Sequence, residues 1–170
     1  MKSGSLATFL SSLQPGLSLE AFAERYPQPA LLLWISEEAL DQSEVLRAGD
    51  TVAEEGVRAL LGGDRPRDRI CFLEKSERNP FANIISLGRA DTNDICVPSQ
   101  QVSKVHAVFM QLGGSWKVGD RGARNGLLVD HRVVPPGGSV PLEDGAVIGF
   151  GAEVEATFHT PAGLFRALFR

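Results

Sequence analysis

The feature that most constrains the fold is a series of short β-prone runs in the second part of the chain. They cover residues 69–75, 83–88, 95–98, 105–112, 115–118, 127–129, 140–142, 146–150 and 153–158. Glycine, proline, asparagine and aspartate, which favour turns, fill the intervals between them. Many short strands without helical repeats are typical of two packed sheets. We therefore expect an all-β sandwich over residues 65–160.

Residues 1–64 predict a mainly helical segment of unknown role. Apolar residues recur at helical spacing from Leu19 to Tyr26, and Ser18 before them is a favoured N-cap. Capping signals predict two more helices, over residues 36–49 and 51–62. The apolar run at residues 30–35 predicts a buried strand between the helices.

The ends of the predicted domains carry their own signals. Acidic residues outnumber basic ones in residues 1–64, and the balance reverses after them. A glycine, proline and charge cluster at residues 62–67 marks the change, and we expect a domain boundary at residue 64. Thr160 as N-cap and Pro161 at the first helical position predict a short C-terminal helix over residues 161–170.

Composition excludes several classes of protein. The net charge of −4 argues against a general nucleic-acid binder, which needs a basic surface. Cys71 and Cys96 are too few for a disulfide framework, so we interpret them as reduced core residues, with a single disulfide as the alternative. The longest apolar run is too short to span a membrane, and the N-terminus lacks a signal-peptide core. We expect a cytoplasmic protein without a membrane partner.

Five short motifs occur in order along the second part of the chain. They are Gly88-Arg89-x-x-x-Asn93-Asp94, Val102-Ser103-Lys104-x-His106-Ala107, Trp116-x-Val118-x-Asp120, Asn125-Gly126 and Leu142-x-Asp144-Gly145-x-x-Ile148-x-Phe150-Gly151. Together they resemble a forkhead-associated (FHA) domain of a small bacterial-type protein, over roughly residues 70–159. The resemblance implies a β-sandwich that binds phosphothreonine peptides through loops at one end, without catalysis or a cofactor.

The residues in these motifs suit a phosphate ligand. A phosphate ester carries about −1.5 to −2 charges and three strong acceptor oxygens. The guanidinium of Arg89 matches that geometry, and the hydroxyl of Ser103 can donate to a further oxygen. The resemblance implies that Arg89 and Ser103 are the main phosphate contacts. Lys104, next in the same loop, can add charge and a backbone N–H.

The resemblance also implies contacts to the rest of the peptide. Asn125 is expected to hydrogen-bond the peptide backbone beside the phosphothreonine, and Arg124 to contact the phosphate or an acidic side chain. The expected partners are a phosphothreonine-containing protein and a Ser/Thr kinase. The residues expected to shape the site are Gly88, Asn93, Asp94, His106 and Gly126.

Two positions depart from the family pattern. The family usually has a small hydroxyl residue where this chain has Ala123, and threonine where it has Leu127. The loss of these hydroxyls removes loop hydrogen bonds around Asn125. The shape of this loop and the affinity for a ligand are therefore open at this point.

Other readings of the same residues predict different functions. Ser103, His106 and Asp120 are the residue types of a hydrolytic triad, but the nucleophile motif Gly-x-Ser-x-Gly is absent, so we do not expect an enzyme. The histidines and cysteines lack metal-ligand spacing. The alternative is a phosphate-independent scaffold that works through residues 1–64. A phosphorylated Thr8 or Thr51 occupying the site is a further hypothesis.

Overall fold

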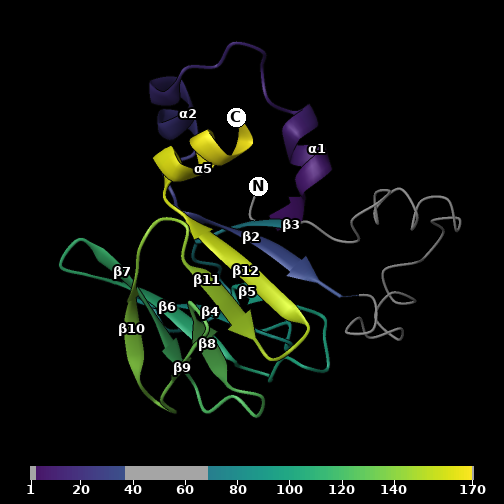
Figure 1. The fold of residues 1–170 in the computed structure, drawn as a ribbon, viewed down its shortest axis with the longest axis vertical. Helices are drawn as coiled ribbons and strands as arrows, with labels where there is room; N and C mark the ends of the chain where they lie inside the picture. The colour runs from purple at the N-terminus through teal and green to yellow at the C-terminus, as the bar shows by residue number, and fades with distance from the viewer. Residues whose placement is uncertain (1–2, 37–68, 170) are drawn as a thin grey trace, which may run out of the picture.

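A computed structural model describes residues 3–36 and 69–169, which form two packed β-sheets with helices at one end (Figure 1). The larger sheet has the strand order β1-β3-β2-β12-β11-β8-β9 and the smaller β10-β7-β6-β4-β5. The larger sheet comprises β1 (Ser3–Ser5), β3 (Arg69–Phe72), β2 (Ala30–Ile35), β12 (Val154–His159), β11 (Val147–Phe150), β8 (Leu127–Val129) and β9 (Arg132–Val134). The smaller comprises β10 (Ser139–Leu142), β7 (Ser115–Asp120), β6 (Ala107–Leu112), β4 (Ile85–Gly88) and β5 (Ile95–Cys96). The predicted β-sandwich is confirmed.

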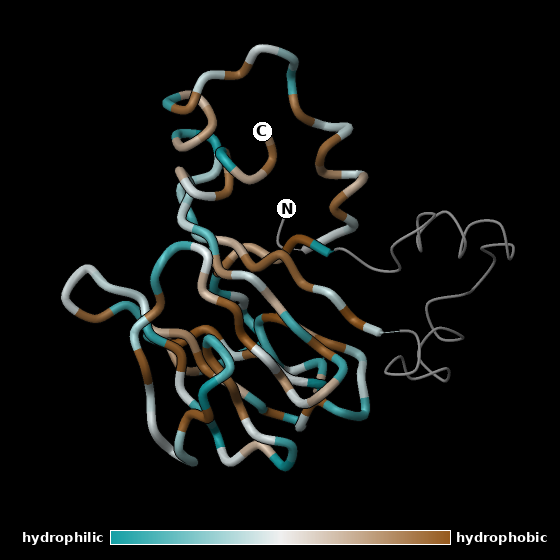
Figure 2. The backbone as a smooth tube through the Cα atoms, in the orientation of Figure 1, coloured by the Kyte–Doolittle hydropathy of each residue, from teal (hydrophilic) through white to brown (hydrophobic). Residues whose placement is uncertain are grey.

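The core lies between the two sheets, and in strands such as β12 and β11 every second residue is buried in it. Along β12, Val154, Ala156 and Phe158 are buried, while Glu155 between them is exposed. Figure 2 shows the same alternation of hydrophobic and hydrophilic residues along the strands. A period of two places every second side chain on the core face, so burial sets the register of a strand that alternates in this way.

Strand β2 is the predicted buried strand, and its pairing shows what holds it. It pairs antiparallel with β12 along its whole length, Ala30 opposite His159 and Ile35 opposite Val154, and with β3 on its other side. The larger sheet thus draws strands from both sides of residue 64. The division of the chain into domains at residues 1–64, 65–160 and 161–170 stays a prediction.

Among the described residues, three helices cover one end of the larger sheet: α1 (Leu6–Ser11), α2 (Leu19–Arg25) and α5 (Pro161–Leu168). Ser18 caps α2 by accepting from the Ala21 N–H, and Thr160 caps α5 in the same way from Gly163, with Pro161 in the first turn. Both predicted helices are confirmed. The predicted helices over residues 36–49 and 51–62 lie outside the described residues, and α1 was not expected.

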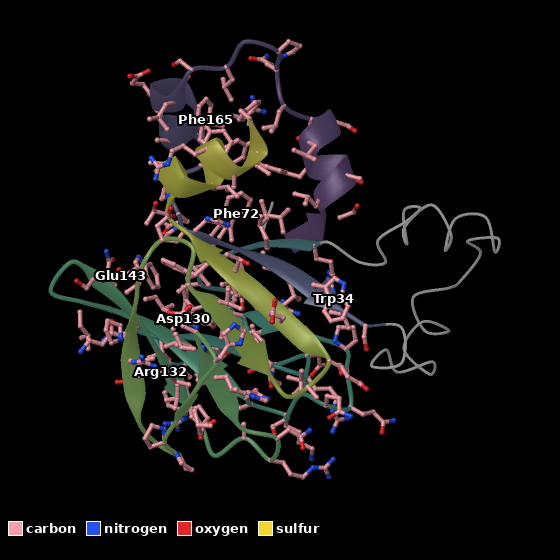
Figure 3. The ribbon with its side chains drawn as sticks, in the orientation of Figure 1. Trp34, Phe72, Asp130, Arg132, Glu143 and Phe165 are labelled. Carbon is pink, nitrogen blue, oxygen red and sulfur yellow. The ribbon has the colours of Figure 1, made fainter. Side chains whose placement is uncertain are left out.

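The helices enclose a second hydrophobic cluster of their own. Phe9 and Phe22 are fully buried there and pack against Phe72, Tyr26 and Phe165. Figure 3 shows Phe72 and Phe165 at this end of the molecule. Edge-to-face ring pairs of this kind add to the stabilisation that burial provides. The cluster therefore attaches the helices to the sheet.

The structure also tests the smaller predictions about the cysteines and about membrane-spanning segments. Cys71 and Cys96 are not joined by a disulfide bond, and burial raises the pKa of the Cys71 thiol to about 11. Cys96 is only half-buried, because it lies on the two-residue edge strand β5. The Trp116 side chain is partly buried and packs against the core. No helix in the two described ranges has the length and apolar character needed to cross a membrane.

We expect Phe22→Ala to lower the free energy of unfolding by about 3–5 kcal/mol, because it empties the centre of the second cluster. Urea unfolding measures the loss. Phe81→Ala is the matched control, since Phe81 is 66% exposed and its removal leaves no cavity. Equal effects of the two substitutions would show that the cluster adds nothing to stability.

Candidate functional site

The predicted site residues lie on three loops that the structure joins at one end of the sandwich. The loops follow β4, β5 and β7, over residues 89–94, 97–106 and 121–126. The Arg89 N–H donates to the Ser103 carbonyl (2.9 Å), and the Arg124 N–H donates to Ser103 Oγ (3.0 Å). Asn125 lies beside Gly151, which precedes β12, whereas α5 follows β12. The site is therefore at the end opposite the helices.

Arg89 is held in a way that leaves most of its guanidinium available. Its side chain is half-buried, and Nε donates to the Val102 carbonyl (3.3 Å). This bond uses one of the five N–H donors of a guanidinium. Within residues 3–36 and 69–169, no carboxylate forms an ion pair with Arg89. The terminal nitrogens can therefore donate to an anion.

Ser103 has its hydroxyl oxygen placed by backbone contacts. Oγ accepts from the Arg124 N–H, so its own proton is free to donate outward. The Ser103 N–H donates to His106 Nδ1 (3.2 Å). The two contacts fix the residue between its own loop and the loop of Arg124. These contacts, and not only its rotamer preference, therefore set the direction of the Ser103 hydroxyl.

His106 is fully buried and connects two of the loops. Because Nδ1 accepts from the Ser103 N–H, the ring proton must lie on Nε2, which is 2.9 Å from the Gly126 carbonyl. The neutral ring therefore satisfies both partners. Burial lowers the pKa of His106 below its ordinary value of 6.5, although the Gly126 carbonyl and the charge of Asp120 oppose this shift.

Asn93 braces the loop of Arg89 against the loop of Ser103. Its Nδ2 donates to the carbonyls of Ala90 (2.8 Å) and Lys104 (2.6 Å). Gly88 lies directly under this contact, where a Cβ would collide with the Lys104 carbonyl and approach Asn93 Nδ2. Glycine is thus required at position 88, because there is no space for a side chain. Gly126 differs, because its φ of +74° favours glycine while the space around it is open.

Asp94 ends the same loop as a buried carboxylate surrounded by donors. Oδ1 accepts from the N–H (2.6 Å) and hydroxyl (2.8 Å) of Ser76, and Oδ2 accepts from the Ser86 N–H (2.8 Å) and from Asn79. Lys75 completes the set with an ion pair at 3.2 Å. Burial by itself raises the pKa of Asp94, but the hydrogen bonds outweigh it and hold the pKa at about 2.

The third loop is shaped by a second carboxylate. Asp120 accepts from the N–H groups of Gly122 (2.9 Å) and Ala123 (3.2 Å), which closes a tight turn. Leu127 is fully buried in the core. At the positions that depart from the family pattern, the loop is thus held by Asp120 and by core packing instead of side-chain hydroxyls.

Four cations gather at this end of an acidic chain. They are Arg89, Lys104, Arg121 and Arg124. None forms an ion pair with a carboxylate of the described ranges, while Asp120 is buried against backbone amides. Uncompensated charges in loops attract a ligand of the opposite sign. The arrangement suits an anion.

The geometry also bears on the catalytic and metal alternatives. The Ser103 backbone N–H, not the hydroxyl, meets His106, and the Asp120 carboxylate binds loop amides. A hydrolytic triad needs a hydroxyl–imidazole–carboxylate relay, and these three residues do not form one. Across the part of the chain that the structure describes, no three potential metal ligands come together.

Comparison with known proteins agrees with the geometry. The FHA domain family model matches residues 85–151. The transcriptional regulatory protein EmbR of Mycobacterium tuberculosis is 28% identical over 154 residues, which is 89% of this chain and 37% of EmbR. The chain thus spans little more than a third of the length of the curated relatives it matches. Residues 85–151 thus match an FHA domain, and strands on either side of this range complete the sandwich.

Two solved structures illustrate the similarity. The MEK1 FHA domain aligns with a TM-score of 0.50 at 13% identity, covering 78% of this chain and 89% of that domain, which supports the fold. A structure described as Mycobacterium tuberculosis EmbR in complex with a low affinity phosphopeptide is 33% identical, with a TM-score of 0.42. That match covers 46% of this chain and 20% of EmbR.

Three supporting residues were not predicted from the sequence. Ser76 and Asn79 surround Asp94 from a segment 15 or more positions earlier in the chain. Gln101 contacts Asn125 through both its backbone and its side chain. A polar residue in a loop carries no signal of such long-range partners. The role of Asp120 had a detectable signal, because aspartate followed by glycine two residues later is typical of an Asx turn.

We expect the stability of the domain to fall steeply in acid because of Asp94. Its pKa is lowered in the folded state, so the stabilisation is complete above about pH 3.8 and is lost as the pH falls through about 2. The shift corresponds to about 2 kcal/mol. Urea unfolding of wild type and Asp94→Asn between pH 5 and pH 2.5 measures it, with Asp91→Asn, an exposed residue of the same loop, as control. A parallel pH dependence in wild type and Asp94→Asn would contradict this role.

We expect His106→Ala to lower the free energy of unfolding by about 2 kcal/mol or more, because it leaves the Ser103 N–H and the Gly126 carbonyl without a partner. The lowered pKa adds a pH dependence. Stability is complete above pH 6.5 and declines below it, as the unfolded chain takes up a proton that the folded ring resists. Thermal unfolding tests both effects, with His131→Asn, in an exposed turn, as control. An unchanged melting temperature would rule out the bridging role.

Proposed function

We propose that this chain is a phosphothreonine-binding signalling adaptor that acts downstream of a Ser/Thr kinase. The observation that carries the proposal is the anchored Arg89 guanidinium, which keeps its terminal donors available between Ser103 and three further cations. Charge-assisted hydrogen bonds from such donors are about twice as strong as neutral ones. The site acts by binding, and the proposed ligand supplies the missing negative charge.

The proposed contacts divide between the phosphate and the peptide. Arg89 and Ser103 bind the phosphate oxygens, and Lys104 adds charge from the same loop as Ser103. Asn125 binds the peptide backbone, while Arg124 contacts the phosphate or an acidic side chain. The FHA domain match supports this assignment, because all five residues lie within the matched range, residues 85–151.

The location of the protein follows from the ligand. A kinase needs ATP to make a phosphothreonine, and a cytoplasmic adaptor meets such a product directly. We therefore place the protein in the cytoplasm. The expected partners remain a phosphothreonine-containing protein and the kinase that phosphorylates it.

The scaffold alternative is disfavoured by the state of Arg89. A domain whose phosphate site has lost its function has no reason to keep this cation unpaired, and among the described residues the Arg89 side chain bonds only a backbone carbonyl. The self-recognition hypothesis is also constrained. Thr8 lies on α1, at the end opposite the loops, so a phosphate on Thr8 is remote from its own site. Thr51 lies outside the described residues.

We expect Arg89→Ala to weaken binding of a phosphothreonine peptide by about 10- to 150-fold and Ser103→Ala by about tenfold, because each removes a hydrogen bond to a charged group. A degenerate phosphothreonine library first selects the peptide, and fluorescence anisotropy measures its affinity. Binding should also weaken as salt increases.

The controls separate phosphate recognition from general charge. Arg25→Ala removes the same charge from α2, at the opposite end of the domain, and should leave the affinity unchanged. The unphosphorylated library should not bind. Equal affinities for wild type and Arg89→Ala would show that the proposed pocket is wrong, and retention of the unphosphorylated library would favour the scaffold.

A further inference from the structure

The side chain of Asn125 is held on one side by a single residue, Gln101. Asn125 Nδ2 donates to the Gln101 carbonyl (2.8 Å) and to Gln101 Oε1 (2.9 Å). A carboxamide nitrogen carries two protons, and the two contacts use both of them. Gln101 thus occupies the entire donor capacity of the Asn125 side chain.

The orientation of the Asn125 amide follows from this chemistry. A backbone carbonyl can only accept a hydrogen bond, so the Asn125 atom that faces it must be the nitrogen. The same nitrogen then requires an oxygen from the Gln101 side chain, which orients that amide too. Asn125 Oδ1 is left on the opposite side of an exposed residue and meets no donor among the described residues.

The base of this contact is rigid. The Gln101 N–H donates to Oγ of Ser99, which is fully buried (3.2 Å). Gly151 lies against both residues, and a Cβ added to it would be 3.3 Å from Asn125 Cβ and 3.4 Å from the Gln101 carbonyl. Close packing on one side and hydrogen bonds on the other restrict rotation of Asn125.

We propose that Gln101 is a positioning residue that makes Asn125 a pure hydrogen-bond acceptor toward the ligand. The inference rests on the proposed phosphothreonine-binding function and narrows its ligand class. Oδ1 can bind only a donor, so the peptide must present a free backbone N–H next to the phosphothreonine. Proline at that position has no N–H and is rejected.

Amide-to-ester peptides test this directly, because an ester replaces one backbone N–H by oxygen. The probe is the selected phosphothreonine peptide, with an ester placed in turn at each of the two positions before and after the phosphothreonine. We expect one position to lose about five- to tenfold in affinity with the wild-type protein, the size of one hydrogen bond. Asn125→Ala should abolish this ester penalty.

Gln101 variants separate positioning from general effects. Gln101→Met keeps the side-chain length and the backbone carbonyl but removes the side-chain acceptor, which releases one of the two Nδ2 protons of Asn125, and should reduce the ester penalty. Gln101→Glu keeps an acceptor oxygen, and should retain the penalty even if its charge weakens all peptides equally. The penalty is a ratio of two affinities for one protein, so it cancels such uniform changes. Phosphothreonine amide, a ligand without flanking residues, checks that the phosphate pocket is intact in each variant.

The outcomes distinguish this inference from the function on which it rests. Absence of phosphothreonine binding by the wild type overturns both. Binding without a penalty at any ester position overturns the assignment of Asn125 as an acceptor. A penalty of equal size in wild type and Gln101→Met overturns the positioning role of Gln101 alone. A smaller penalty in Gln101→Met with its full retention in Gln101→Glu establishes the role.

Discussion

The buried carboxylate of Asp94 is the interaction on which the binding end of this domain depends. It satisfies donors from the segment before β4 and from β4 itself, and so fixes where the loop of Arg89 ends. A buried charge is costly unless donors surround it, and here they do. Arg89, the cation that would bind a phosphate, is thus positioned by the Asp94 carboxylate, an anion that does not contact the ligand. His106, as a neutral ring, holds the other two loops together in a similar way, by bonding Ser103 and Gly126.

The contacts that stabilise the domain and the residues proposed for recognition lie at opposite ends of it. Aromatic packing of Phe9 and Phe22 attaches the helices at one end, while polar networks arrange the loops at the other. Polar networks specify geometry because each donor needs a particular acceptor, whereas aromatic packing tolerates more variation. Arg89, Lys104, Arg121 and Arg124 lie at the loop end without a carboxylate partner among the described residues, so an anionic ligand can compensate their charge. The negative net charge of the chain is compatible with an anionic ligand for this reason.

Prediction from the sequence succeeded where a signal is local. Ser18 and Thr160 were recognised as caps because a cap depends on a few adjacent residues, and residues 30–35 were recognised as a strand from their apolar run. The partner of that strand could not be predicted, because β12 lies more than 100 positions later and pairs through the backbone. For the same reason the Arg124–Ser103 bond, which joins a backbone N–H to a hydroxyl across two loops, left no trace in the motifs.

The amino-acid sequence alone specifies the class of the domain and its chemistry. Strand-length runs, turn residues and five ordered motifs define a sandwich with an arginine and a serine suited to a phosphate. Only the folded chain decides which donors remain free. Gln101 and Asn125 are 24 positions apart, and their contact depends on two loops meeting beside Gly151. Hydrogen bonds between loops depend on distances of a few ångströms, which strand pairing across the whole sandwich sets.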